Sequence, residues 1–397
     1  MEYLPNISNV LWKEHPAVRD EIIGSWAPAS GIAEAGPDYD AERQAWIGFN
    51  LVSGVGPVRT ERLIDLFGSL ADAWRAQPGR LRQVLDEGTV ERLVEVRNQG
   101  EVDRTIERMI ETGISAITLL DDDYPELLAE IPAPPPLLYV KGDLLRDDRQ
   151  AVAIVGTRRM TAYGRDLTAS IAAGLARAGV TVVSGLALGV DGAAHQAALD
   201  AGGRSLAVKG CGVAYPYPAT HRRLSADIAG SGALIAEYPP DRKPDANNFP
   251  ARNRLISGLS LATVVIEAPE RSGALITVSF AADQGREVFV VPGDVRSLMS
   301  AGCNALLREG ARAVRSAVDI LEDLNIGGRA TAAPNQIAFP MDDTERLVMA
   351  TLSREPKHID EIAAALGLPI HQLATQLMML ELKGAVRNTG AQHYAVS

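Results

Sequence analysis

The stretch that decides the fold is AIVGTRRMTAYGRDLTASIAAGLARAGVTVVSGLALGVDGAAHQAAL, which runs from Ala153 to Leu199. It begins with a short apolar run and a glycine turn, continues with a helical pattern, and then repeats the same order. This order predicts two strand–turn–helix units of a nucleotide-binding, doubly wound sheet. The first turn, Gly156–Arg159 (GTRR), has arginines where a dinucleotide site would have glycines. Since the chain also lacks G-x-x-x-x-G-K-[ST], we expect neither a dinucleotide cradle nor a triphosphate cradle.

Further apolar runs of strand length continue this pattern. Residues 150–320 alternate such runs with helical segments, and the runs are apolar throughout, as in strands that are buried on both faces. We therefore expect an α/β fold with an extended Rossmann-like parallel sheet over residues 121–325. Its ligand should lie beyond the carboxyl ends of the strands. The predicted strands are AVAIVG, VTVVSG, RSLAVKG, ALIAEY, LATVVIEA and EVFVVPG.

Composition and charge limit the class of protein. With 397 residues the chain is too long for one typical domain, so we expect two or three. Cys211 and Cys303 lie far apart, which suits a reducing compartment and gives no metal site. Without a signal-peptide pattern or an apolar run of bilayer length, we expect a soluble cytoplasmic protein with no membrane partner. The net charge of −11 lowers the expectation of nucleic-acid binding but allows one basic groove.

The N-terminal part is predicted to be helical after an irregular extension over residues 1–40. Residues 41–120 are expected to form a domain of helix-hairpin-helix or SAM-like type. Its turn, Gly54–Gly56 before Pro57, either holds a phosphate through free backbone amides or simply joins two packed helices, and both interpretations stay open. Four prolines between residues 132 and 136 are interpreted as a stiff domain junction.

The C-terminal part has the order of a winged-helix domain. Residues 326–340 are a linker by composition, and residues 341–397 give three helical patterns followed by a short hairpin. The third helical pattern, PIHQLATQLMMLELKG, carries no arginine, and Lys383 lies at its far end. A helix that reads DNA places basic or amide side chains near its N-terminal end. We therefore expect this domain to contact protein or to play a weak accessory role.

The turn after the first strand has the chemistry of a phosphate contact. Gly156 allows close approach of the backbone, and Thr157 offers a hydroxyl. Arg158 and Arg159 offer planar guanidinium groups that suit phosphate oxygens. Taken alone, such a pair would be interpreted as two solvated arginines on a loop.

An aromatic residue beside arginines makes a second candidate, in NNFPARNRLISGLS. The residues concerned are Phe249, Arg252, Asn253 and Arg254, and a helix is expected to begin after them. Such a set can stack a base and hold its phosphates. The alternative is a buried phenylalanine with arginines that cap carbonyls or pair with acids such as Glu237 and Glu267.

The third candidate is Ser272-Gly273, at the start of a helix whose N-terminus suits anions. Because all three candidates follow or border strand ends on one edge of the predicted sheet, they indicate an extended polyanion as the ligand. Asp191 and His195 are a separate case, since they lie four residues apart on one helix face. We favour a structural role for this pair over an acid–base pair, because no nucleophile is placed to complete a triad. We expect no catalytic residue and no cofactor.

The ordered motifs VGTRRMTAYG, SGLALGVDGAAH, FPARNRLISGLS, EAPERSGALITVSFAADQGREVFVVPG and SAGCNALLREGA closely resemble the DprA/Smf family of DNA-processing proteins. The resemblance covers roughly residues 45–320. It implies a Rossmann-like domain that binds single-stranded DNA, a homodimer, and the loading of RecA onto incoming strands in natural transformation. The DNA contacts that it implies here are Gly156, Thr157, Arg158, Phe249, Arg252, Asn253, Arg254, Ser272 and Gly273.

Two features depart from the family pattern, and two rival functions are considered. Relatives often carry a lysine soon after a Tyr-Pro pair, where this chain has Tyr217 and Pro218, and basic residues before Phe-Pro, where it has Asn247 and Asn248. The main rival is a nucleotide enzyme that resembles the lonely-guy-type phosphoribohydrolases, although their Pro-Gly-Gly-x-Gly-Thr run is absent. The second is a transcription regulator that acts through residues 341–397.

Overall fold

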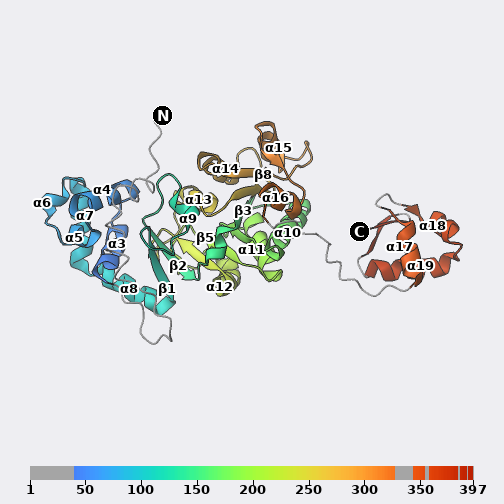
Figure 1. Cartoon of the computed structure of the whole chain (residues 1–397), viewed down its shortest axis with the longest axis horizontal. Coiled ribbons are helices and arrows are strands. Elements are labelled where there is room, and N and C mark those ends of the chain that lie inside the picture. The colour runs from blue at the N-terminus through green and yellow to red at the C-terminus, as the bar shows by residue number, and fades with distance from the viewer. Residues whose placement is uncertain (1–39, 327–342, 354–356, 383–384, 391, 397) are drawn as a thin grey trace. The chain divides into compact units, whose positions relative to one another are not determined.

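The computed structural model describes residues 40–326, 343–353, 357–382, 385–390 and 392–396 (Figure 1). The chain divides into two compact units, and the division falls after Gly328. The extension expected over residues 1–40 and the linker expected over 326–340 lie almost entirely outside the described residues. Among the described helices none is by itself long and apolar enough to cross a membrane, and one bent pair in the second unit reaches that length and composition only when joined.

Short helices open the first unit, as the sequence predicts. They are α3 (Ala41–Leu51), α4 (Pro57–Phe67), α5 (Leu70–Arg75), α6 (Pro78–Leu81), α7 (Glu87–Gln99) and α8 (Glu101–Thr112). The expected hairpin is formed by α3 and α4. Pro57 occupies the first turn of α4, where its missing N–H costs no hydrogen bond, and Gly54 in the turn has a φ of +100° that favours glycine.

The described part of the first unit contains a nine-stranded sheet with the order β1-β2-β6-β5-β4-β3-β7-β8-β9. The pairs from β6 across to β9 are parallel, whereas β2 pairs antiparallel with both β1 and β6. The six predicted strands are confirmed as β3 to β8. The strands are β1 (Ile114–Thr118), β2 (Leu137–Gly142), β3 (Ala151–Val155), β4 (Thr181–Ser184), β5 (Ser205–Val208), β6 (Ala233–Ala236), β7 (Ala262–Val265), β8 (Glu287–Val290) and β9 (Arg312–Ala313).

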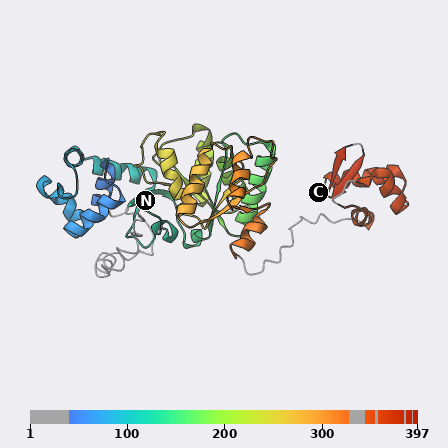
Figure 2. The ribbon, with the colours of Figure 1, turned by 90° about the horizontal axis from the view of Figure 1, so that it is seen from above.

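Helices cover both faces of this sheet, which is the doubly wound arrangement. α10 (Ala162–Arg177), α11 (Val190–Asp200) and α16 (Ala317–Asp323) share a core with one face, and α13 (Asn248–Gly258) and α14 (Gly273–Asp283) share a core with the other. Figure 2 shows the yellow and orange helices, which include α13 and α14, packed beside the strands. The remaining helices are α9 (Glu126–Ala129), α12 (Arg222–Ser231) and α15 (Ala301–Arg308), with short 3-10 turns at Arg146–Arg149 and Ala219–His221.

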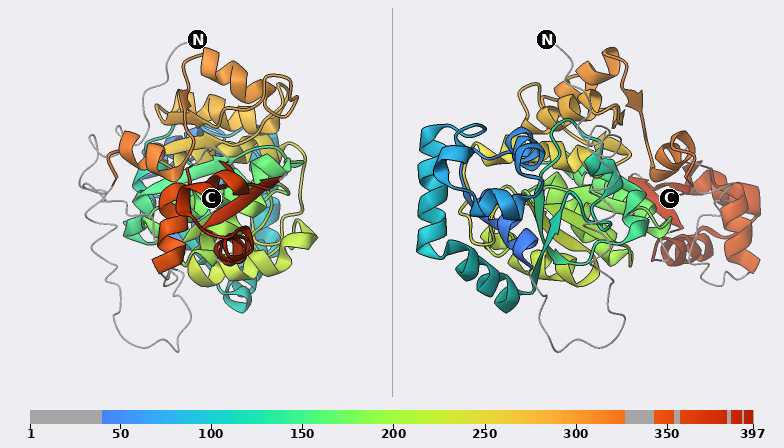
Figure 3. Two further views of the ribbon diagram at one scale, coloured as in Figure 1. Left: turned by 90° about the vertical axis from the view of Figure 1, so that its right-hand side faces the viewer. Right: turned by 60° about the vertical axis from the view of Figure 1, so that its left-hand side comes forward.

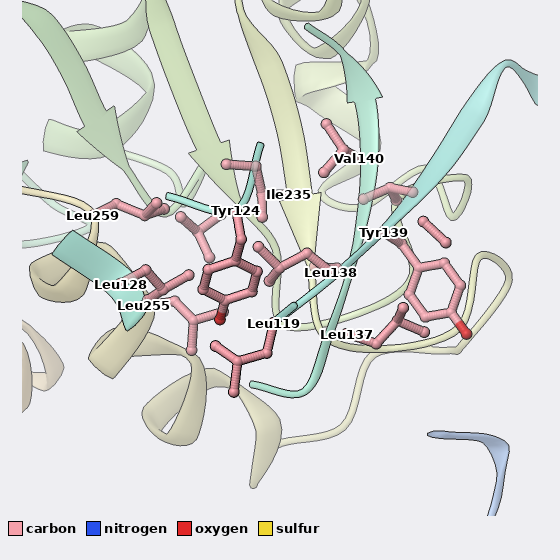
Figure 4. Packing of buried hydrophobic residues seen from close by; sticks show 14 of the residues in the cluster. Leu119, Tyr124, Leu128, Leu137, Leu138, Tyr139, Val140, Ile235, Leu255 and Leu259 are labelled. Carbon is pink, nitrogen blue, oxygen red and sulfur yellow. The ribbon is translucent and has the colours of Figure 1, made fainter. Parts of the chain in front are cut away.

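The proline-rich segment lies within the sheet-bearing part of the unit, because β1 precedes it and β2 follows it directly. The ring of Tyr124 packs beside Leu128 and Leu255, and its hydroxyl donates to the Pro135 carbonyl at 2.9 Å (Figure 4). Since Leu255 belongs to α13, this packing fixes the helix that carries the second group of candidate residues. The segment therefore supports α13 within one unit, and it is not the junction between domains that its prolines predict.

The helices α3–α8 continue the same core and adjoin the edge formed by β1 and β2 (Figure 3, right view). Arg43 joins them to the sheet, since it donates to the Ala116 carbonyl and pairs with Asp121 at 2.9 Å. Asn50 donates to the Glu237 carbonyl at 3.1 Å. The helical part is thus packed directly on the sheet.

The second unit has the predicted winged-helix elements. They are α17 (Asp343–Thr351), α18 (Ile359–Leu366) and α19 (Ile370–Leu382), with a small sheet of β10 (Lys357–His358), β11 (Val386–Gly390) and β12 (His393–Val396) in the order β10-β12-β11. Its core is built from Val348, Ile362, Leu373 and Leu377, among others.

Candidate nucleic-acid interface

The turn Gly156–Arg159 lies at the topological switch point of the sheet. The chain leaves β3 toward α10 on one face and leaves the neighbouring β7 toward α14 on the other, and such a point opens a crevice at the carboxyl edge. The Thr157 amide donates to the Glu267 carbonyl at 2.7 Å. A Cβ on Gly156 would lie 2.6 Å from the Val190 side chain, so only glycine fits there. The turn is therefore held firmly, while Arg158 and Arg159 stay exposed.

A carboxylate occupies the N-terminus of α10, where doubly wound proteins usually bind a pyrophosphate. Glu267 is buried and accepts hydrogen bonds from the Thr161 amide at 2.8 Å and the Thr161 hydroxyl at 2.6 Å. Gly164 leaves the room for this side chain. A second anion at this helix end would be repelled by Glu267, which agrees with the expectation of no dinucleotide cradle.

A cleft of about 80 Å³ adjoins the switch point and brings together three of the predicted residues, Arg158, Phe249 and Arg252. The Phe249 ring lies against Gly210, where a Cβ would come within 2.7 Å of it. The Tyr217 ring lies beside Phe249, with centroids 5.4 Å apart and planes inclined by 36°. The other lining residues are Gly185, Leu186, Ala187, Leu188, Lys209, Gly210, Cys211 and Pro218.

The segment that carries Phe249 is helical, and the expected loop before a later helix is wrong. α13 begins at Asn248, and Pro250 is tolerated because the first turn of a helix needs no N–H donor there. Phe249 and Arg252 are three residues apart and share a helix face, which brings both to the cleft. Asn253 instead donates to the Gly273 carbonyl at 3.3 Å.

Arg252 and Arg254 are engaged inside the protein, as in the structural alternative. Arg252 is 5% exposed and donates to the carbonyls of Gly185 and Val208, at 2.9 Å to the former. Burial lowers the pKa of its guanidinium, against the opposing charge of Asp191. Arg254 pairs with Glu237 and donates to the Ala133 carbonyl. Arg252 thus forms the wall of the cleft, and Arg254 ties α13 to the proline-rich segment.

Asp191 and His195 have the structural role that the sequence analysis favours. Asp191 accepts from the amides of Gly185 and Ala187 at 3.1 and 3.3 Å, which fixes the loop before α11, and burial raises the pKa of its carboxyl. The His195 Nδ1 atom lies 2.7 Å from the Ser205 hydroxyl. Complete burial lowers the pKa of His195 to about 3, so the ring is neutral near pH 7.

The Ser272-Gly273 candidate caps α14 at the same edge. The Ser272 hydroxyl accepts from the Ala274 amide at 3.3 Å, and Gly273 is exposed. The adjacent Arg271 is also exposed. Within the described ranges, the guanidinium groups of Arg158, Arg159 and Arg271 have no ion pair or hydrogen bond, so this edge offers cations that are available to a ligand.

Two lining residues stand out that were not among the candidates. Lys209 is 4% exposed, and its ammonium donates to the carbonyls of Tyr215 and Val213 at 2.5 and 3.3 Å, while burial lowers its pKa. Lys209 directly follows an apolar strand, so in the sequence it cannot be distinguished from a solvated residue at a strand end. Tyr217 was noted only where a relative's lysine would stand, and its packing on Phe249 depends on a loop that the sequence does not specify.

The two other predicted modules offer less to DNA. In the hairpin turn, Arg59 and Arg92 donate to the carbonyls of Gly54 and Ser53, so these cations already have protein partners. Whether this turn holds a phosphate stays a prediction. In the second unit α19 exposes Ile370 and Met378 and has no lysine or arginine between Ile370 and Leu382.

Comparisons with known proteins agree on one family. The family model described as DNA recombination-mediator protein A matches residues 115–325, and the model described as DprA winged helix domain matches residues 330–391. The chain is 35% identical over 393 residues to protein Smf of Synechocystis sp., covering 89% of this chain and 99% of that one. It is 39% identical over 365 residues to the putative DNA processing protein DprA of Mycobacterium tuberculosis, covering 87% and 92%. The solved structure of DNA processing protein A from Streptococcus pneumoniae matches with a TM-score of 0.63 and 32% identity, covering 70% of this chain and 97% of that one.

Proposed function

The chain belongs to the DprA/Smf family of DNA-processing proteins, and from this premise we propose that it binds single-stranded DNA without sequence preference and acts as a recombination mediator. In this role it works as a homodimer and loads RecA onto incoming strands in natural transformation. It does not catalyse a reaction on the DNA. The family resemblance and the description of the matching family as a recombination mediator support this role.

The observation that carries the DNA site is the cleft at the switch point. It combines an aromatic side chain, Phe249, with the free guanidinium of Arg158, and further free cations lie along the same edge at Arg159 and Arg271. Aromatic stacking and phosphate contacts recur in every nucleotide of a strand, whatever its base. Phe249 is therefore assigned to a base, and Arg158 and Arg159 to phosphates.

Glu267 supports a strand rather than a small nucleotide as the ligand. A mononucleotide or dinucleotide in a doubly wound fold relies on the helix N-terminus for its phosphates, and here Thr161 already donates to the buried carboxylate. The remaining donors lie outside, on exposed loops. In this proposal Arg252 positions the cleft wall, and Asn253 with Ser272-Gly273 forms a neighbouring contact.

The test is fluorescence anisotropy with labelled oligo-dT and a matched duplex. Wild type should prefer the single strand, and Arg158→Ala should bind more weakly, with the slope of log K against log salt reduced by about 0.7. Arg177→Ala is the matched control, because Arg177 is exposed and ends α10, roughly 24 Å along the helix from its start. This control should bind like wild type.

Two further measurements separate the rival functions. Release of free base from nucleoside monophosphates, with no single-strand preference, would replace the proposal by a nucleotide enzyme. Tight binding to one duplex sequence that is lost on deletion of residues 341–397 would replace it by a transcription regulator. Mediation is followed by RecA-dependent ATP hydrolysis on single strands that are already coated with a single-strand binding protein, which wild type should accelerate.

A further inference from the structure

Tyr217 extends the aromatic surface of the cleft beyond Phe249. The two rings lie 5.4 Å apart and are inclined by 36°, and both line the same cleft. Tyr217 is 38% exposed, although its ring packs on another aromatic side chain. Within the part of the chain that the structure describes, its hydroxyl has no hydrogen-bond partner. Part of this side chain is therefore open to a ligand.

The loop that carries Tyr217 is fixed at several points. The Tyr215 carbonyl accepts from the Tyr217 amide at 2.9 Å and from the Lys209 ammonium at 2.5 Å. The amides of Gly212 and Ala214 donate to the carbonyls of Arg242 and Pro240 at 2.9 and 3.0 Å. A ring on such a loop loses little further freedom when a ligand binds, so its contacts contribute more fully to affinity.

The charges of the cleft are mostly unavailable to a phosphate. Its charged lining residues are Arg158, Lys209 and Arg252. Lys209 and Arg252 donate to backbone carbonyls, so among the described lining residues only Arg158 has a cationic group without a protein partner. Contacts inside the cleft must therefore depend on stacking more than on charge.

We propose that Tyr217 is a base-stacking residue of this protein, and that with Phe249 it forms a two-ring platform for the bases of a single strand. Lys209 is a positioning residue, which holds the Tyr217 loop through the Tyr215 carbonyl. The inference rests on the proposed function, because the platform has a role only if the cleft receives DNA. It adds a recognition element that acts on bases and is independent of salt.

The experiment compares oligo-dT with an abasic strand of the same length and charge. Tyr217→Ala should weaken binding to oligo-dT by roughly 5- to 150-fold, the effect of losing one stacked base, and should leave binding to the abasic strand within about twofold of wild type. Its salt slope should stay unchanged, and Tyr217→Phe should bind oligo-dT like wild type. Lys209→Met should lower binding to oligo-dT alone, by a smaller factor.

Tyr163→Ala is the matched control, because Tyr163 is an exposed tyrosine at the start of α10 that does not line the cleft. It should bind both strands like wild type. Equal losses on both strands for Tyr217→Ala would overturn the inference, since they would indicate a structural defect. An unchanged affinity for oligo-dT, while Arg158→Ala is impaired, would overturn it and leave the proposed function intact. If wild type does not bind oligo-dT at all, the proposed function and this inference both fail.

Discussion

Arg252 gives the sharpest test of how the cleft is built. The sequence alone places it among the phosphate ligands, whereas the structure places it in the wall, where it donates to the carbonyls of Gly185 and Val208 beside the buried Asp191. Arg252→Met keeps an unbranched apolar stem and removes the guanidinium with its charge and its hydrogen-bond donors. We therefore expect the main effect of this substitution to be a lower free energy of unfolding, and not the loss of a specific phosphate contact.

The magnitude follows from the groups that the substitution leaves behind. Each unpaired buried carbonyl costs about 1–3 kcal/mol, and removing the guanidinium also leaves the charge of the nearby buried Asp191 less compensated. Because these terms overlap, we expect a total loss of about 3–5 kcal/mol, which for a unit of this size lowers Tm by on the order of 10 °C. Asp191→Asn added to Arg252→Met should restore about 1–2 kcal/mol, since the amide keeps an acceptor for the Gly185 N–H and carries no charge.

The assay is urea and thermal unfolding followed by circular dichroism, together with oligo-dT binding for each variant. Arg158→Ala is the control from the same cleft. Because the Arg158 side chain is exposed, the free energy of unfolding of this variant should stay within about 0.5 kcal/mol of wild type. If Arg252→Met unfolds like wild type while its affinity and salt slope fall as in Arg158→Ala, Arg252 is a phosphate ligand and the wall assignment is refuted.

Two further predictions concern groups near the cleft. Burial lowers the pKa of His195 from its ordinary value of 6.5 to about 3, so below pH 6.5 the unfolded chain binds the proton first and the free energy of unfolding falls as the pH falls toward 3. In His195→Asn, urea unfolding between pH 6 and pH 4 should show a fall that is shallower by up to about 1.4 kcal/mol per pH unit. An unchanged slope would show that the ring is not a buried neutral group. Gly210→Ala should displace the Phe249 ring, because the new Cβ would lie 2.7 Å from it. In fluorescence anisotropy this variant should lose more affinity for oligo-dT than for the abasic strand. If the variant binds oligo-dT as tightly as wild type does, the Phe249 ring takes no part in binding.

Much of the fold is readable from the sequence because its signals are local. The strands β3 to β8 are continuous apolar runs, and the helices α10 and α14 follow a threonine cap and a serine cap. The antiparallel extension was missed because β1 is a five-residue strand that directly follows a helix, and its pairing with β2 is decided by contacts 19 to 27 residues away. A boundary at residue 120 therefore separated β1 from its own sheet.

The site could be predicted only in part, because residues of the same type point to different places, some to solvent and some into the protein. Arg158, Arg252 and Arg254 look alike in the sequence. Of these three, only Arg158 has a guanidinium without a partner among the described residues. The deciding fact for Arg252 is the start of α13 at Asn248, since helical spacing then turns it beneath Phe249 and onto buried carbonyls. A helix that begins with Asn-Phe-Pro gives only a weak start signal, and an arginine between two buried carbonyls cannot be recognised before the strands that supply them are placed.

Glu267 gives a physical reason why, in the proposed function, a sheet of nucleotide-binding type takes a polymer. In such folds the helix N-terminus after the first strand concentrates phosphate binding at one point, which limits the ligand to one or two nucleotides. Here the Glu267 carboxylate takes that point through Thr161, and the free cations lie outside it, on the exposed turns at Arg158, Arg159 and Arg271. In the proposed function, phosphate contacts are then spread along the sheet edge, with the aromatic cleft beside them. A ligand that repeats phosphate and base at regular intervals can contact the cleft and several of these cations at once, whereas a nucleoside monophosphate carries only one phosphate.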